Sequence, residues 1–136
     1  MRKVLVCTLF FLTLLILAVN PNYKSEIVGA NYVTVYSANY SGANSKLVKN
    51  NSMLFHYGKV KGESALLDKS WDIDKIKNTY RADIVFVERV QDKVIYYLKY
   101  ANAKYQTQID GKVINMQVVV DKDFVKVGVP VIFEGF

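Results

Sequence analysis

Hydrophobic and polar residues alternate along most of the second half of the chain. The alternation runs through residues 83–90, 93–101, 105–109, 112–120 and 124–133. β-Branched and aromatic residues fill these segments, as is common in strands that pack one face against a core. A period of two places successive side chains on opposite faces of a sheet. The pattern therefore predicts an antiparallel sheet at the centre of the fold.

Turn sequences separate these predicted strands. Asp110–Gly111 stands between two alternating segments, and it is a strong hairpin signal because both central residues of such a turn need a positive φ. Gln91–Asp92 has the same two-residue spacing. Pro130 cannot donate a backbone hydrogen bond, so we expect the segment Phe124–Phe133 to be an edge strand or to lose its pairing near Pro130. An exposed edge of that kind would allow a homodimer through strand pairing.

The segment Lys112–Val120 gives the clearest prediction of the two faces of the sheet. Its apolar side chains fall on one side of the strand: Ile114, Met116, Val118 and Val120. Asn115 and Gln117 fall on the other side. We therefore expect one buried face and one solvated face, with Asn115 and Gln117 in contact with water.

One stretch has helical periodicity. Residues Glu63–Tyr80 carry apolar side chains three and four positions apart, which predicts an amphipathic helix packed on the sheet. These side chains are Leu66, Leu67, Trp71, Ile73, Ile76 and Tyr80. Asp72 is suited to cap the second part of this helix, and Trp71 is expected to fill the space between helix and sheet. The preceding segment, Ser52–Val60, is predicted to be a strand.

The first twenty residues have the pattern of an export signal. Arg2 and Lys3 precede an apolar run, Val4–Val19, that is short for a membrane span of about 20 residues. Small residues at Val28–Ala30 fit a cleavage site but lie far beyond the apolar run, whereas Ile16–Ala18 is closer and fits poorly. We therefore predict either a cleaved signal peptide or a retained N-terminal anchor. The basic residues at its start predict that the rest of the chain lies outside the cytoplasm.

These patterns divide the chain into three parts. Residues 1–20 are predicted to be the signal peptide or membrane anchor, residues 21–51 a linker with one possible strand at Asn31–Tyr40, and residues 52–136 an α+β domain. A small polar stretch, Ser41–Ser45, is interpreted as a loop. The expected fold class is α+β, with one amphipathic helix packed on an antiparallel sheet of four to six strands.

Charge and cysteine content narrow the classes of function. The 136-residue chain has a formal net charge of +6, and its basic residues are spread along it without blocks. A mild excess of this kind suits solubility, or affinity for anionic surfaces such as wall polymers, lipid head groups or nucleic acid. The only cysteine is Cys7, inside the apolar run. A disulfide framework and a thiolate metal site are therefore excluded.

No group of residues has the spacing of a catalytic or metal site. His56 is the only histidine, and it lacks a second ligand at metal-binding spacing and a visible nucleophile partner. Asp72 and Asp74 point in different directions on a helix. Asp121 and Asp123 lack the further oxygen ligands that calcium requires. We therefore expect no catalytic residues, no cofactor and no metal.

Tyrosine and lysine residues are interleaved in and after the segment 93–101. Tyr97, Lys99, Lys104 and Tyr105 could form an aromatic and basic binding surface for a sugar, a base or a peptide. The alternative is that the tyrosines line the rim of the core and direct their hydroxyl groups outward. Both interpretations stay open at the level of sequence.

The last third of the chain resembles a known family. The sequence GKVINMQV at residues 111–118, followed by VGVPVIF at residues 127–133, is similar to the C-terminal signature of YwmB-like exported proteins of Gram-positive bacteria. The order of predicted elements from Ser52, a strand, a helix and then four or five strands, is similar to half of the TATA-box-binding-protein-like fold after which that family is described. The resemblance implies this fold and an exported protein. It implies no activity, no site residue and no DNA binding.

Together these observations predict a non-enzymatic binding domain outside the cytoplasm, associated with the bacterial envelope. Its expected partner is a protein or an anionic envelope polymer, and it would contact the membrane through the N-terminal segment if that segment is retained. One alternative is a secreted inhibitor or immunity-type factor that acts on a partner protein. An uncharacterised enzyme would need a pocket that joins His56 to a carboxylate, and nucleic-acid binding would need basic residues gathered on one face. Neither is expected.

Overall fold

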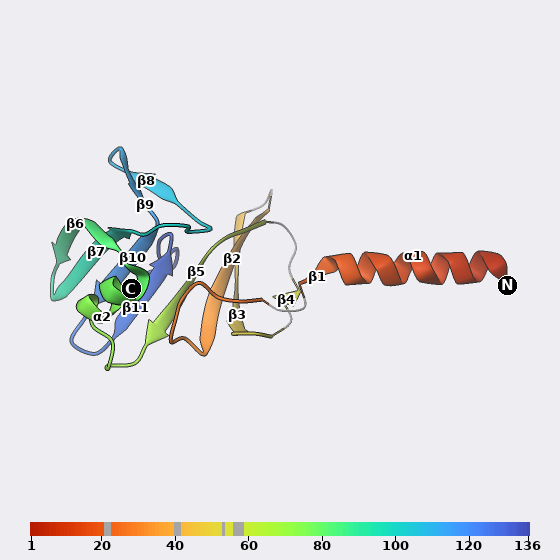
Figure 1. Ribbon diagram of the computed structural model, residues 1–136, viewed down its shortest axis with the longest axis horizontal. Coiled ribbons are helices and arrows are strands. Elements are labelled where there is room, and N and C mark those ends of the chain that lie inside the picture. Colours follow the sequence, from red (N-terminus) through yellow and green to blue (C-terminus); the bar gives the residue numbers. More distant parts are fainter. Residues whose placement is uncertain (21–22, 40–41, 53, 56–58) are drawn as a thin grey trace.

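The computed structural model describes residues 1–20, 23–39, 42–52, 54, 55 and 59–136 of the chain. Within these residues the fold is α+β, with a seven-stranded antiparallel sheet and two helices (Figure 1). The strands of this sheet are β2 (Tyr32–Asn39), β3 (Gly42–Lys49), β5 (Lys59–Leu67), β6 (Asp83–Val90), β7 (Lys93–Lys99), β10 (Met116–Val120) and β11 (Val125–Val129). Their order across the sheet is β3-β2-β5-β11-β10-β7-β6. The predicted fold class is confirmed, and the sheet is larger than the four to six strands expected.

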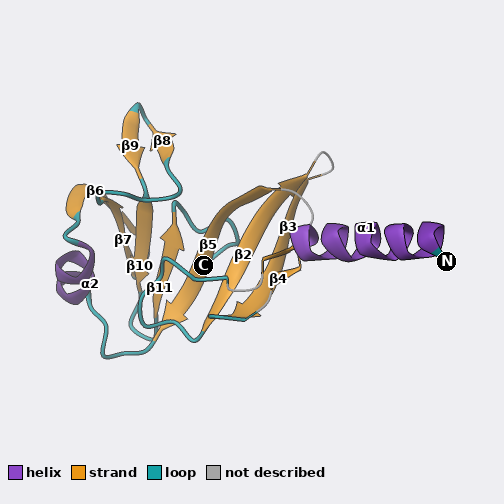
Figure 2. Ribbon diagram, turned by 45° about the vertical axis from the view of Figure 1, so that its right-hand side comes forward, coloured by secondary structure: helices purple, strands orange, loops and turns teal. Residues whose placement is uncertain are grey.

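The remaining elements lie outside the large sheet. They are α1 (Arg2–Ala18), α2 (Ile73–Tyr80), β1 (Val19–Asn20), β4 (Leu54–Phe55), β8 (Thr107–Ile109) and β9 (Lys112–Ile114). β1 pairs with β4 and β8 pairs with β9, each as a two-stranded antiparallel sheet. Figure 2 shows the hairpin of β8 and β9 projecting from one end of the large sheet. α2 lies next to β6 and β7, on the side of the sheet away from α1.

The segment expected to be a linker supplies two strands of the large sheet. β2 pairs with β3 along its length and with β5 on its other side. The one possible strand predicted at 31–40 is confirmed within β2, whereas the prediction of a linker in the rest of 21–51 is wrong at β3, which forms a second strand. The loop expected at 41–45 is wrong from Gly42 onward, and Ser41 lies outside the described residues. The small polar residues gave a loop signal, but the backbone hydrogen bonds that join β3 to β2 do not depend on those side chains.

The helix predicted at Glu63–Tyr80 is confirmed only at Ile73–Tyr80, which forms α2. Residues up to Leu67 belong to β5, which pairs with β2 on one side and with β11 on the other. Leu66 is exposed and Leu67 is buried, which is the alternation of a strand. Pairing on both sides of β5 outweighs the helical spacing of its leucines. α2 follows with the predicted N-cap, Asp72, whose carboxylate accepts a hydrogen bond from the Lys75 backbone N–H at 2.7 Å.

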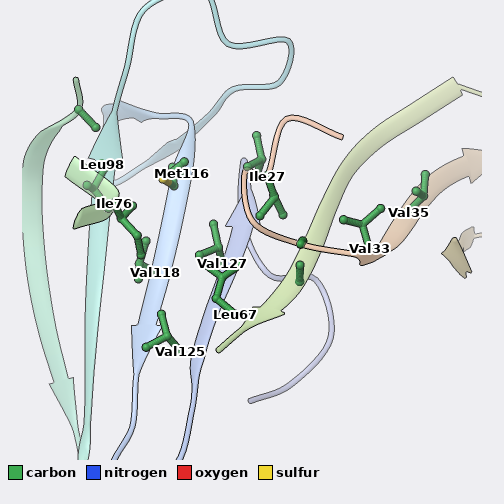
Figure 3. Packing of buried hydrophobic residues seen from close by; sticks show 14 of the residues in the cluster. Ile27, Val33, Val35, Leu67, Ile76, Leu98, Met116, Val118, Val125 and Val127 are labelled. Atoms are coloured by element: carbon green, nitrogen blue, oxygen red, sulfur yellow. The ribbon is translucent and has the colours of Figure 1, made fainter. Parts of the chain in front are cut away.

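One face of the large sheet, the helix face, is covered by α2 and by residues 23–30. The most deeply buried side chains of its core are Ile27, Val33, Ile76, Leu98, Met116, Val118, Val127 and Val129. Figure 3 shows Ile76 of α2 among side chains of β7 and β10, and Ile27 beside β11 and β5. Trp71 is half-buried against this core, and its ring lies directly on the backbone at Gly29.

The opposite face, the tail face, is covered in part by the C-terminal segment 130–136. Its core is smaller and consists of Ile95, Tyr97, Ile114, Val119 and Ile132. Gly128 lets the segment lie directly on the sheet, because a Cβ at this position would fall 2.4 Å from the carbonyl carbon of Val131. Both faces of the central strands are therefore buried, and the prediction of one solvated face is wrong.

Asn115 is buried because its side chain binds backbone groups. Its Oδ1 accepts a hydrogen bond from the Tyr100 N–H at 2.9 Å, and its Nδ2 donates to the Tyr100 carbonyl at 2.7 Å. These bonds lie where the predicted strand 112–120 divides into β9 and β10. Because the strand is divided here, the Ile114 side chain packs in the core of the tail face. The Met116 and Val118 side chains pack in the core of the helix face.

Gln117 is also buried, and it holds the C-terminal segment on the tail face. Its Oε1 accepts a hydrogen bond from the Ile132 backbone N–H at 2.8 Å. The prediction that Gln117 contacts water is therefore wrong, since a buried amide needs a partner and the C-terminal segment supplies one.

β11 is a central strand of the sheet. It pairs with β5 and β10, so the prediction of an edge strand at 124–133 is wrong, and a homodimer through that edge has no basis. The alternative prediction, that pairing ends near Pro130, is confirmed because β11 ends at Val129. The edges of the sheet are β3 and β6, and β6 has a bulge between Ile84 and Phe86.

Both predicted hairpin turns are confirmed. β6 and β7 are joined through Gln91–Asp92, with Gln91 at a φ of 54°. β8 and β9 are joined through Asp110–Gly111, at φ values of 50° and 76°. Positive φ at these positions is what a two-residue turn between twisted strands requires.

The apolar N-terminal run forms α1, and the described side chains of this helix, in residues 1–14, are exposed. Figure 1 shows α1 extending away from the large sheet. In the described part of the chain, no helix has both the length and the hydropathy needed to cross a membrane.

Candidate functional site

The four residues of the predicted aromatic and basic surface do not come together. Tyr97 is buried on the tail face, where its ring stacks on Phe86 with 4.1 Å between ring centroids and its hydroxyl donates to Glu88 at 2.9 Å. Tyr105 packs instead against the core of the helix face. Lys99 and Lys104 are exposed. The two aromatic rings are therefore part of the packing, as the alternative interpretation predicts.

Glu63 is the centre of a buried polar network that sequence reasoning did not single out. It lies on β5 in the helix face and is fully buried. Its carboxylate accepts four hydrogen bonds, all from residues 23–27. The donors are the Tyr23 hydroxyl, the Ser25 hydroxyl at 2.9 Å, the Glu26 backbone N–H, and the Ile27 backbone N–H at 3.2 Å. The sequence signal that could have revealed the buried position of Glu63 is the period of two. Once the segment is recognised as a strand, this period places Glu63 on the same face as Ala65 and Leu67.

Glu26 extends this network to α2 and to the loop after β7. Its carboxylate accepts hydrogen bonds from the Tyr100 hydroxyl at 2.7 Å and from the Lys104 backbone N–H at 2.8 Å. The Tyr80 hydroxyl donates to the Glu26 carbonyl at 2.8 Å and accepts from the Val28 N–H at 2.6 Å. Residues 23–28 are thus bonded to β5, to α2 and to the loop that follows β7.

The electrostatics of the network follow from its burial. Burial raises the pKa of Glu63, although its hydrogen-bond donors act in the opposite direction. Burial and nearby carboxylates also raise the pKa values of Tyr23 and Tyr100, and burial raises that of Tyr80 to about 12. The tyrosines therefore remain protonated donors at neutral pH. Because protein groups occupy both oxygens of the buried Glu63 carboxylate, the network holds the chain together and offers no site for a ligand.

An open pocket lies on the tail face, beside the C-terminal segment. Its volume is about 410 Å³, and three neighbouring strands contribute exposed apolar side chains to it. Tyr32 of β2 is 56% exposed, Leu47 of β3 is 68% exposed and Leu66 of β5 is 64% exposed. These three side chains surround Thr34, which pairs with Leu47 on one side and Ser64 on the other. The pocket is therefore lined on one side by apolar groups that no other part of the described chain covers.

The other side of the pocket is polar. The carboxylate of Glu134 accepts a hydrogen bond from the Ser64 hydroxyl at 2.6 Å and pairs with the Lys126 ammonium at 2.7 Å. Its second oxygen, Oε2, is buried and has no hydrogen-bond partner among the described residues. Burial raises the pKa of Glu134 and lowers that of Lys126. Asp68 adds a second, exposed carboxylate at the rim.

The described residues contain no group of three or more histidine, cysteine, aspartate or glutamate side chains that could hold a metal ion. His56 lies outside the described residues. Cys7 is an exposed free thiol on α1. The pocket beside the C-terminal segment is consequently the strongest candidate for a functional site in the described chain.

Comparisons with known proteins identify no relative. The chain matches no protein-family model, no curated protein and no solved structure. The resemblance to YwmB-like proteins therefore stays a prediction, and the argument about function depends on the site itself.

Proposed function

We propose that this protein is a non-enzymatic binding domain outside the cytoplasm, and that its pocket on the tail face docks a segment of a partner protein. The observation that carries the proposal is the exposure of Tyr32, Leu47 and Leu66 around one concave surface. Adjacent exposed apolar side chains of this size, with polar groups at the margin, are typical of surfaces that bind proteins.

The chemistry of the pocket favours a partner segment that carries an apolar side chain next to a basic one. The apolar side chain would pack on Leu47 and Leu66, which are unfavourable to leave in water. Asp68, the exposed carboxylate at the rim, complements a cationic donor, because Lys126, the basic side chain of the pocket, pairs with Glu134.

The distribution of charge disfavours an anionic polymer or a nucleic acid. Exposed lysine and arginine residues occur on β3, β5, α2, β6 and β9 and in several loops. Binding to a polyanion depends on neutralising several neighbouring phosphates or carboxylates, which requires a gathered basic surface. The pocket has more acidic than basic side chains.

Export is supported by the basic start and apolar composition of α1, whose described side chains pack against no other part of the chain. A helix of this composition would deliver the domain and, if retained, associate with the membrane.

Photo-cross-linking in intact bacterial cells tests the proposal. A photo-reactive residue replaces Leu66 in the full chain, and the control position is Gln108, which is exposed on the β8–β9 hairpin. We expect one defined protein to be cross-linked from position 66 and not from position 108. Adding Leu47→Asp should lower the yield about tenfold, equivalent to about 1.4 kcal/mol of binding free energy.

Two outcomes contradict the proposal. Equal cross-linking from positions 66 and 108 means that the pocket has no selective partner. An unchanged yield in the Leu47→Asp variant means that the apolar side of the pocket is not used. Cell fractionation of the same samples checks the location, since the cross-linked species should be absent from the cytoplasm.

A further inference from the structure

The sequence contains one stretch that satisfies the small-residue rule for removal of an export signal, although it lies far beyond the apolar run, and the structure places that stretch inside the folded domain. Small residues at Val28–Ala30 fit the requirement of a signal peptidase. Cleavage after Ala30 would release Tyr23, Ile27 and Ala30, which are 6%, 1% and 6% exposed and belong to the core of the helix face.

Cleavage there would also break the Glu63 network. All four of these hydrogen-bond donors to the Glu63 carboxylate come from residues 23–27, so the released peptide would take them away together. It would also uncover a core position that is fully buried in the intact chain, and both losses destabilise the domain. The same cut would remove the Glu26 carboxylate from Tyr100 and Gly29 from the ring of Trp71.

Backbone contacts hold the start of the segment as well. The Tyr23 N–H donates to the Ser52 carbonyl at 3.3 Å, and the Asn51 N–H donates to the Tyr23 carbonyl at 3.0 Å. Ser25 is fixed by its backbone N–H, which donates to Asn50 Oδ1 at 3.1 Å. The folded domain therefore includes Tyr23, close to the end of the apolar run.

We propose that Tyr23–Ala30 is part of the mature domain, and that any cleavage of the leader is confined to peptide bonds before Tyr23. The inference rests on the proposed export of the protein. It follows that the sequence at Val28–Ala30, although it satisfies the small-residue rule, is not a processing site.

N-terminal sequencing and intact-mass measurement of the full chain, expressed with a C-terminal tag and recovered from outside the cytoplasm, test this. We expect the first residue to be Tyr23 or a residue before it. A mature chain that begins between Lys24 and Asn31 overturns the inference.

A variant at the excluded site sharpens the test. Val28 is 50% exposed, so Val28→Lys is compatible with the fold, yet a long charged side chain at this position blocks cleavage after Ala30. We expect the variant to be processed as the unchanged chain is, with a mass that differs only by the substitution. Accumulation of an unprocessed Val28→Lys chain, under conditions in which the unchanged chain is processed, would overturn the inference.

Hydrogen exchange separates this inference from the export proposal. The backbone N–H groups of Glu26, Ile27 and Val28 are hydrogen-bonded, and in the full chain they should exchange at least about 100-fold more slowly than in an unstructured peptide. Slow exchange in a protein found only in the cytoplasm supports the inference and refutes export. Exchange at the unstructured rate refutes the inference wherever the protein is found.

Discussion

The two faces of the large sheet are covered in different ways. On the helix face, α2 and residues 23–30 form a continuous cover, tied to the sheet through Glu63 and to α2 through Tyr80. On the tail face, the segment 130–136 packs on β10 and β11 and places Phe133 against Tyr36 of β2, and the pocket beside it stays open over other residues of β2, β3 and β5. The comparison suggests that the helix face maintains the fold, while the tail face leaves surface for a partner.

Removing Glu63 should have the largest effect, because it disrupts the cover of the helix face. Glu63→Ala removes the shared acceptor of four donors in residues 23–27, of which the Ile27 N–H keeps the Ser25 Oγ as a second acceptor, and we expect the free energy of unfolding to fall by about 3 kcal/mol or more. Glu63→Gln keeps an acceptor oxygen and should cost less. Chemical denaturation measures both, with Asp123→Ala, at an exposed turn, as the control that should change little. Equal losses in the alanine and glutamine variants would contradict a role based on accepting hydrogen bonds.

The same residue gives a pH dependence. Because the pKa of Glu63 is raised in the folded state above its ordinary value of 4.5, the unfolded chain releases this proton at lower pH than the folded one. The contribution of Glu63 to stability is therefore complete below pH 4.5 and declines as pH rises through the folded pKa. Unfolding free energies measured across this range should fall less steeply with pH in Glu63→Gln than in the unchanged chain.

Lifting the C-terminal segment from the tail face should have an intermediate effect. In Gly128→Ala the new methyl group meets the backbone at Val131 and Ile132, and we expect a loss of about 1–3 kcal/mol together with faster hydrogen exchange of the Ile132 amide. Gly135→Ala is the matched control, since a Cβ at that position meets nothing within 4 Å. If both variants are equally stable, the C-terminal segment does not lie on the sheet as described.

Changing the open pocket should have the smallest effect on stability. Leu66→Ser alters a side chain that is 64% exposed, and we expect the free energy of unfolding to change by less than about 0.5 kcal/mol. Leu67→Ser, at the neighbouring buried position, should cost several times more, because adjacent residues of a strand face opposite sides. Thermal unfolding of the two variants distinguishes a strand from the helix that the leucine spacing suggested.

Turns, helix caps and the alternation within a strand depend on residues close in sequence, and these parts of the fold are predicted from the sequence. The turn at Asp110–Gly111 follows from the φ values that its residues tolerate, and the N-cap at Asp72 follows from a carboxylate placed before a helical stretch. The alternation within β7 correctly separates Leu98, on the helix face, from Tyr97, on the tail face.

Long-range partners decide the parts that were mispredicted. Asn115 and Gln117 look like solvated positions until Tyr100 and Ile132 supply their hydrogen bonds. β5 looks helical until β2 and β11 pair with it, and the polar side of the pocket forms only because Lys126 and Glu134, distant in sequence, come to lie beside β5. A single sequence read by its periodicity carries no information about such pairings.

The β6 edge has a consequence for the protein at high concentration. Most of this strand is exposed, yet Asp83, Glu88 and Arg89 introduce charges along it and the bulge between Ile84 and Phe86 interrupts its regular ladder. An approaching strand from another molecule would meet mismatched spacing and would have to strip water from ionised groups. The sheet is thereby protected on this side against lateral growth into fibrils.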